Sequence, residues 1–310
     1  MNDFERDIET ERSDLVTEPH VGEHGPPKRM RRRQKLFAVL PTLLTLGNAA
    51  CGFGAITFAA KVGPTDVPGN EFLIASTLIF LAMFFDMLDG RAARWANQTS
   101  EFGAQLDSLC DALSFGAAPA FLMLRFVQTE LFAGVRSTFE YPSRLLWWIA
   151  ALYVICAILR LARFNVETDE EDSHDSFSGL PSPAAAGTVA SFPIAVRGVL
   201  DMLQPTATES AREVAQWLLP AAQITLPLIT FAVACLMVSR IRYSHVFNQL
   251  VTGKRSRQHV IQLVFTIAII LLVQEMAVPV IFCYFAFAAP LRALWQEVIS
   301  RWWTRRPQTQ

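Results

Sequence analysis

The chain has 310 residues, of which 52% are hydrophobic and 18% are charged, whereas a soluble domain is about 25% charged. This composition excludes an ordinary soluble enzyme and indicates an integral membrane protein, because a membrane-spanning helix needs about 20 mainly apolar residues. The net charge of −1 gives no argument for a nucleic-acid partner.

Apolar runs bounded by charges, glycine or proline predict eight membrane-spanning helices. They are expected at residues 38–61, 72–90, 107–127, 145–162, 183–203, 215–238, 259–273 and 276–294. The last two can instead form one broken segment, since only Gln274 and Glu275 separate them. The predicted fold is an all-α polytopic membrane bundle, with a charged tail at 1–35, a membrane-embedded domain at 36–296 and a second tail at 297–310.

The basic residues predict how the chain crosses the membrane. An even number of spans places both termini on one side, and 21 of the 27 Lys and Arg residues then lie on that side. Because positive charge favours the inner face, both termini are expected in the cytoplasm and the protein in the cytoplasmic membrane. The basic run 28–35 either sets this topology or also binds anionic membrane lipid.

Two aspartates, Asp86 and Asp89, stand near the end of the second predicted span, in the sequence D-M-L-D-G-R-A-A-R. On a helix they share a face about 140° wide with Gly90, Ala93 and Arg94. The small residues on this face leave room for a large group to approach the carboxylates.

The third predicted span carries two more aspartates, Asp107 and Asp111, which share a face with Gly103 because the three residues are four apart. A short connection can bring the two helices together, and four carboxylates would then repel one another unless cations neutralise them. Oxygen ligands suit hard cations such as Mg²⁺ or Mn²⁺. The four aspartates therefore predict a site for two divalent metals facing a nucleotide pyrophosphate.

A cation transporter is the alternative from a different class, because acidic residues inside membrane spans often line ion paths. A transporter should distribute its acidic groups along several spans. The spans from the fourth onward contain no comparable cluster, which favours an enzyme.

The full pattern D-x-x-D-G-x-x-A-R, eight residues, G-x-x-x-D-x-x-x-D is filled at every fixed position. It resembles the signature of the CDP-alcohol phosphatidyltransferases. The resemblance implies that the aspartates hold two divalent cations against CDP-diacylglycerol and that Asp111 is the general base. It also implies that CDP lies against Gly90, Ala93, Arg94 and Gly103.

The first span resembles the bacterial phosphatidylserine synthase branch of that family. It reads L-P-T-L-L-T-L-G-N-A-A-C-G over residues 40–52, with Thr45 and Asn48 as the implied CDP contacts. Thr42 departs from the pattern, because the branch usually has Asn after the proline. R-L-A-R-F-N at 160–165 and F-S-G-L-P-S-P-A-A-A-G at 177–187 also resemble this branch. The resemblance implies L-serine as the acceptor and a homodimer.

Arg160 and Arg163 are three residues apart at the cytoplasmic end of the fourth span. They can clamp a substrate carboxylate or phosphate, or simply extend to the membrane interface. Acceptor binding is the prediction. The alternative acceptors, glycerol 3-phosphate or an inositol phosphate, carry an extra phosphate and should require more basic residues.

Overall fold

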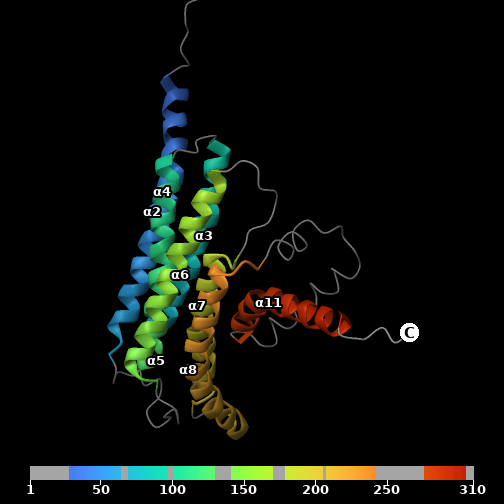
Figure 1. Ribbon diagram of the computed structural model, residues 1–310. Helices are drawn as coiled ribbons and strands as arrows, with labels where there is room; N and C mark the ends of the chain where they lie inside the picture. Colours follow the sequence, from blue (N-terminus) through green and yellow to red (C-terminus); the bar gives the residue numbers. More distant parts are fainter. Residues whose placement is uncertain are drawn as a thin grey trace, which may run out of the picture. The chain divides into compact units, whose positions relative to one another are not determined.

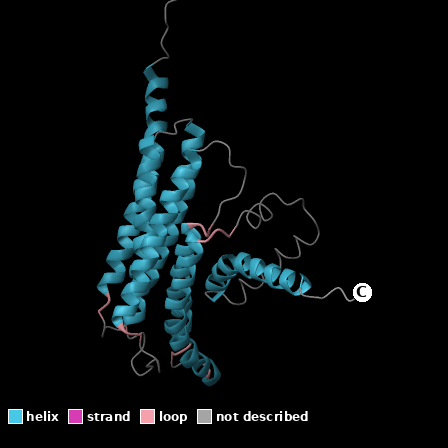
Figure 2. Cartoon of the chain, viewed as in Figure 1, coloured by secondary structure: helices cyan, strands magenta, loops and turns pink. Residues whose placement is uncertain are grey.

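The computed structural model describes residues 28–63, 69–96, 101–129, 141–169, 179–204, 207–241 and 276–304. The chain divides into two compact units, Met1–Val39 and Leu40–Gln310. Every regular element in the described ranges is helical (Figure 2). Helix α2, Lys28–Lys61, includes the end of the first unit and the start of the second, and the remaining helices belong to the second unit.

The helices of the second unit are coloured in chain order in Figure 1. After α2 come α3 (Glu71–Ala96), α4 (Glu101–Asp111), α5 (Ala118–Gln128), α6 (Ser143–Asp169), α7 (Ser182–Asp201), α8 (Glu209–Val238) and α11 (Ala277–Thr304). A π-helical segment, η1 (Ala112–Ala117), joins α4 to α5 without a break.

Six helical segments of the described chain are long and apolar enough to cross a membrane. They are Leu40–Lys61, Glu71–Ala92, Glu101–Gln128, Ser143–Val166, Ser182–Asp201 and Glu209–Val238. They correspond to the first six predicted spans and confirm the polytopic helical bundle. The predicted span 259–273 lies outside the described residues. The predicted span 276–294 falls on α11, whose apolar part, Ala277–Arg292, is shorter than the other six.

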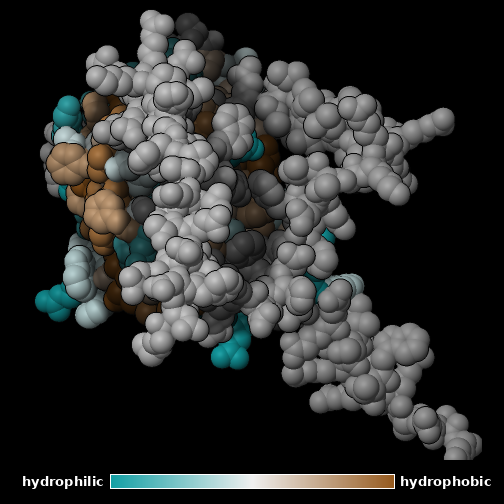
Figure 3. Space-filling model, turned by 90° about the horizontal axis from the view of Figure 1, so that it is seen from above, coloured by the Kyte–Doolittle hydropathy of each residue, from teal (hydrophilic) through white to brown (hydrophobic). Residues whose placement is uncertain are grey.

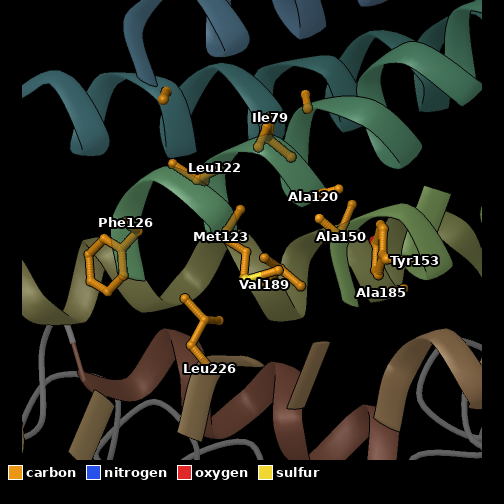
Figure 4. Close-up of a cluster of buried hydrophobic side chains, with 14 of the residues drawn as sticks. Ile79, Ala120, Leu122, Met123, Phe126, Ala150, Tyr153, Ala185, Val189 and Leu226 are labelled. Carbon is orange, nitrogen blue, oxygen red and sulfur yellow. The ribbon is translucent and has the colours of Figure 1, made fainter. Parts of the chain in front are cut away.

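The core of the second unit lies between α3, α5, α6, α7 and α8. Large side chains from these five helices interlock there, and Figure 4 shows Ile79, Met123, Phe126, Tyr153, Val189 and Leu226 among them. Other large apolar side chains point outward, including Phe53, Trp148 and Trp217. Brown, hydrophobic side chains on the outer surface in Figure 3 fit a bundle whose surroundings are lipid.

Small residues let the helices approach closely, as is usual between membrane helices. On α7, Gly187 leaves space for the ring of Phe282 from α11, since a Cβ there would lie 2.2 Å from that ring. The Phe282 ring also packs edge-to-face on Phe80 of α3, with centroids 5.4 Å apart. These contacts place α11 against α7 and α3.

Candidate active site

Three of the predicted aspartates meet between α3 and α4. Asp86 and Asp89 lie one turn apart on α3, and Asp107 lies on α4. Each offers a carboxylate oxygen, and these oxygens all lie within 4.8 Å of one another. Asp86 and Asp89 lie near the end of the candidate span Glu71–Ala92, and Asp107 lies near the start of the candidate span Glu101–Gln128.

Two carboxylate oxygens of this cluster are buried without a hydrogen-bond partner among the described residues. They are Asp89 Oδ2 and Asp107 Oδ1. Burying a carboxylate oxygen without a partner is costly, and two neighbouring carboxylates add repulsion. A divalent cation removes both costs, and the donor set, which is all oxygen, suits Mg²⁺ or Mn²⁺. The residues present therefore fit a divalent metal.

The fourth aspartate, Asp111, is buried one turn after Asp107 and near the other three carboxylates. Its Oδ1 accepts a 2.9 Å hydrogen bond from Nδ2 of Asn48 on α2. Asn48 is fully buried, and its own Oδ1 has no partner in the described part of the chain. Asp111 is thus held by α2, and the three other aspartates form the closer group.

The π-helix η1 begins directly after Asp111, and its backbone packs closely against the backbone of α2. A Cβ on Gly52 would lie 2.7 Å from Ser114 Cα, so only glycine allows this approach. One turn earlier on α2, the main-chain oxygen of Asn48 accepts a 2.9 Å hydrogen bond from Ser114 Oγ. From α6, the buried Tyr153 hydroxyl donates to Phe115 O at 3.1 Å. These contacts fix Asn48 beside Asp111.

The predicted CDP contacts lie around the aspartates as far as they are described. Thr45 is buried on α2 beside Asp89. Gly90 is exposed on α3, and a Cβ there would meet nothing within 4 Å. Gly103 lies half-buried at the start of α4. Ala93 and Arg94 lie on α3, and their side chains are outside the described part.

The charge of Arg160, the first of the two predicted arginines, acts on Asp111 and Asp86. It is half-buried on α6, and its Nη1 donates a 2.8 Å hydrogen bond to Ser182 Oγ at the start of α7. Arg163 lies three residues further along α6, also half-buried, and its contact with an acceptor stays a prediction.

Sequence reasoning did not select four of the residues that support this site: Ser108, Ser114, Tyr153 and Ser182. Ser108 and Asn165 exchange hydrogen bonds of 2.9 and 3.2 Å, which tie α6 to α4 next to Asp107. Ser108 and Ser182 lie within the motifs quoted above. As polar residues in an apolar chain, they could have been identified from the sequence as candidate site residues. Tyr153 carried no such signal.

Several known proteins resemble this chain. The family described as CDP-alcohol phosphatidyltransferase matches residues 38–228. A CDP-diacylglycerol–serine O-phosphatidyltransferase of Helicobacter pylori is 34% identical over 148 residues, 48% of this chain and 54% of its own. One from Saccharomyces cerevisiae is 34% identical over 160 residues, 50% of this chain and 53% of its own. An archaetidylserine synthase of Methanothermobacter thermautotrophicus is 37% identical over 158 residues, 50% of this chain and 58% of its own.

The chain spans about half the length of the curated relatives that it matches. The matched region contains all four aspartates, Asn48 and Arg160. Because the family match covers more than half of the residues, the chain belongs to the CDP-alcohol phosphatidyltransferase family.

Proposed function

We propose that this protein transfers the phosphatidyl group of CDP-diacylglycerol to L-serine, which yields phosphatidylserine and CMP. The observation that carries the proposal is the meeting of Asp86, Asp89 and Asp107, with two buried oxygens that lack partners among the described residues. The names of the relatives, serine O-phosphatidyltransferases and an archaetidylserine synthase, support serine as the acceptor.

The four aspartates would hold two divalent cations, with Asp86, Asp89 and Asp107 as the closer group and Asp111 beside them. When bound, the cations supply polarisation of the phosphoryl oxygens and neutralise charge on the departing CMP. Thr45, Asn48, Ala93 and Arg94 are the proposed CDP contacts, and Gly90 and Gly103 leave space for the pyrophosphate. The site lies at the end of the spans, where a lipid-linked donor can place its phosphates while its chains stay in the bilayer.

Asp111 is the proposed general base. The serine hydroxyl oxygen forms a bond to the phosphorus esterified to diacylglycerol, the bond from that phosphorus to CMP breaks, and Asp111 accepts the hydroxyl proton. The hydrogen bond from Asn48 fixes one carboxylate oxygen of Asp111, which keeps the base in a single orientation.

Arg160 is the proposed partner of the serine carboxylate, with Arg163 beside it on α6. A guanidinium can bind a carboxylate through two parallel hydrogen bonds, whereas an ammonium cannot. We expect Arg160→Lys to raise the KM for serine at least about fivefold, with the KM for CDP-diacylglycerol changed less than about twofold. Steady-state kinetics in detergent test this, with Arg197→Lys as the control because Arg197 pairs with Asp201 on α7, at 3.7 Å. An unchanged KM for serine in Arg160→Lys would remove Arg160 from the acceptor site.

The orientation of the protein in the membrane and its oligomeric state are also proposals. The distribution of Lys and Arg supports both termini and the active site on the cytoplasmic side of the cytoplasmic membrane. The family resemblance supports a homodimer. Cysteine accessibility in intact cells and mass measurement of the purified protein test these two points.

The acceptor is tested by supplying purified protein with CDP-diacylglycerol, Mn²⁺ or Mg²⁺ and a panel of labelled alcohols. We expect L-serine to be used and ethanolamine, glycerol 3-phosphate and an inositol phosphate to be poor acceptors, because a site that pairs the serine carboxylate penalises its loss. Preference for glycerol 3-phosphate or an inositol phosphate would overturn the serine assignment and leave the family chemistry in place.

A further inference from the structure

Ser182 is the first residue of α7, and its side chain is fully buried against α6. Its Oγ accepts a 2.8 Å hydrogen bond from Arg160 Nη1. The helix N-cap is Pro181, which makes no side-chain capping bond. Ser182 follows the N-cap position, and its hydroxyl contacts a neighbouring helix.

The backbone of the turn before Ser182 is hydrogen-bonded to the backbone at the end of α8 and just beyond it. The N–H of Gly179 donates to Ile241 O at 2.9 Å, and the N–H of Leu180 donates to Leu236 O at 3.0 Å. Gly179 has φ +91°, and a Cβ there would lie 2.4 Å from Met237 O. Glycine is required for both reasons. The position of Ser182 is thus set by α8, independently of Arg160.

The guanidinium of Arg160 has two kinds of neighbour. Its Nη1 donates to Ser182 Oγ, and its Cζ lies 5.6 Å from the centroid of the Phe164 ring. The carboxylates of Asp111 and Asp86 also attract its charge. A guanidinium has five N–H donors in one plane, so a single fixed bond restricts the direction of the remaining four. Without the Ser182 bond, the guanidinium is free to turn toward the aspartates.

We propose that Ser182 is a positioning residue: its hydroxyl holds the Arg160 guanidinium in the orientation that binds the carboxylate of the acceptor. The inference rests on the proposed function, because it takes serine as the acceptor and Arg160 as its partner. It explains why a serine stands in the G-L-P-S-P turn, whose backbone is bonded to the end of α8 and whose serine is bonded to α6.

The test compares Ser182→Ala with Ser191→Ala. Ser191 is a matched control because it is also fully buried on α7, and its hydroxyl donates to Thr188 O within the same helix. We expect Ser182→Ala to raise the KM for serine about fivefold, the size of one typical hydrogen bond lost. The kcat and the KM for CDP-diacylglycerol should stay within about twofold of wild type, and Ser191→Ala should change none of the three values.

A double-mutant cycle with Arg160→Met separates positioning from a general structural role. If Ser182 acts through Arg160, Ser182→Ala should change the KM for serine less than about twofold once the guanidinium is gone. Should Ser182→Ala not fold, Ser182→Cys replaces it, because a thiol keeps the shape but is a weak acceptor.

Two results would overturn the inference alone: an unchanged KM for serine in the Ser182 variants, or an equal increase in the presence and absence of Arg160. In both cases wild type would still form phosphatidylserine, so the proposed function would stand. A wild-type protein that makes no phosphatidylserine from serine would overturn both proposals.

Discussion

Replacing Asp89 by Asn is expected to lower kcat by about a thousandfold while the protein still inserts and folds. Asp89 is 4% exposed, and its Oδ2 is buried without a partner among the described residues. Substitution by an amide removes a metal ligand and its charge together but keeps the size of the side chain. We expect the same result for Asp86→Asn and Asp107→Asn, because each supplies one oxygen to the same group.

Thermal unfolding distinguishes loss of the metal site from loss of the fold. In EDTA, Asp89→Asn should unfold at a temperature equal to or higher than wild type, because it removes repulsion between buried like charges. Adding Mn²⁺ should raise the Tm of wild type and leave that of Asp89→Asn unchanged, since ligand binding stabilises only a protein that binds it. Glu101→Gln, an exposed acid on α4, is the control and should behave as wild type. A full Mn²⁺-induced shift in Asp89→Asn would contradict the assignment of Asp89 as a ligand.

Gly52→Ala is expected to have the second largest effect. Its new Cβ would lie 2.7 Å from Ser114 Cα, a backbone atom that cannot move without shifting η1 against α2. The shift would separate Asn48 from Asp111, whose 2.9 Å bond depends on the register of these two elements. We expect destabilisation by about 1–3 kcal/mol, as for other overpacked sites, and a kcat at least about tenfold lower.

Gly47→Ala is the matched control for Gly52→Ala. Both glycines lie on α2, but a Cβ on Gly47 would be 3.6 Å from the Phe85 ring, an ordinary contact. Alanine favours a helix over glycine by about 1 kcal/mol, so Gly47→Ala should keep or increase stability. Thermal unfolding and steady-state kinetics of both variants test the pair. Equal effects of the two substitutions would show that the close contact between α2 and η1 contributes neither to stability nor to activity.

The aspartate cluster could be predicted because helical periodicity alone determines which residues share a face. The spacing of Asp86 to Asp89 is one turn, and that of Asp107 to Asp111 is another, so two adjacent helices bring their carboxylates together. The first six spans could be predicted because the bilayer core selects for continuous apolar runs. Their ends could not, since a helix need not stop where its apolar run stops. Helix α6 continues to Asp169, beyond the predicted end at residue 162.

The supporting contacts could not be predicted because they join residues far apart in the sequence. The hydrogen bond between Asn48 and Asp111 spans 63 residues, and that between Tyr153 and Phe115 spans 38. No periodicity encodes such pairs. The π-helix after Asp111 was also unexpected, since its sequence A-L-S-F-G-A has no helix-breaking residue except one glycine. The sequence does not distinguish Arg160 from Arg163, and it does not predict the hydrogen bond from Arg160 to Ser182.

In the proposed reaction, the aspartate cluster uses divalent metal to transfer a phosphatidyl group from CDP-diacylglycerol to serine. Its test follows both products, CMP and phosphatidylserine, from purified protein in vesicles that contain CDP-diacylglycerol and receive labelled serine. We expect equal amounts of the two products, none in EDTA, recovery on addition of Mn²⁺ or Mg²⁺, and none from Asp111→Asn with metal present. Product formation that persists in EDTA, or in Asp111→Asn at the wild-type rate, would contradict the proposed reaction.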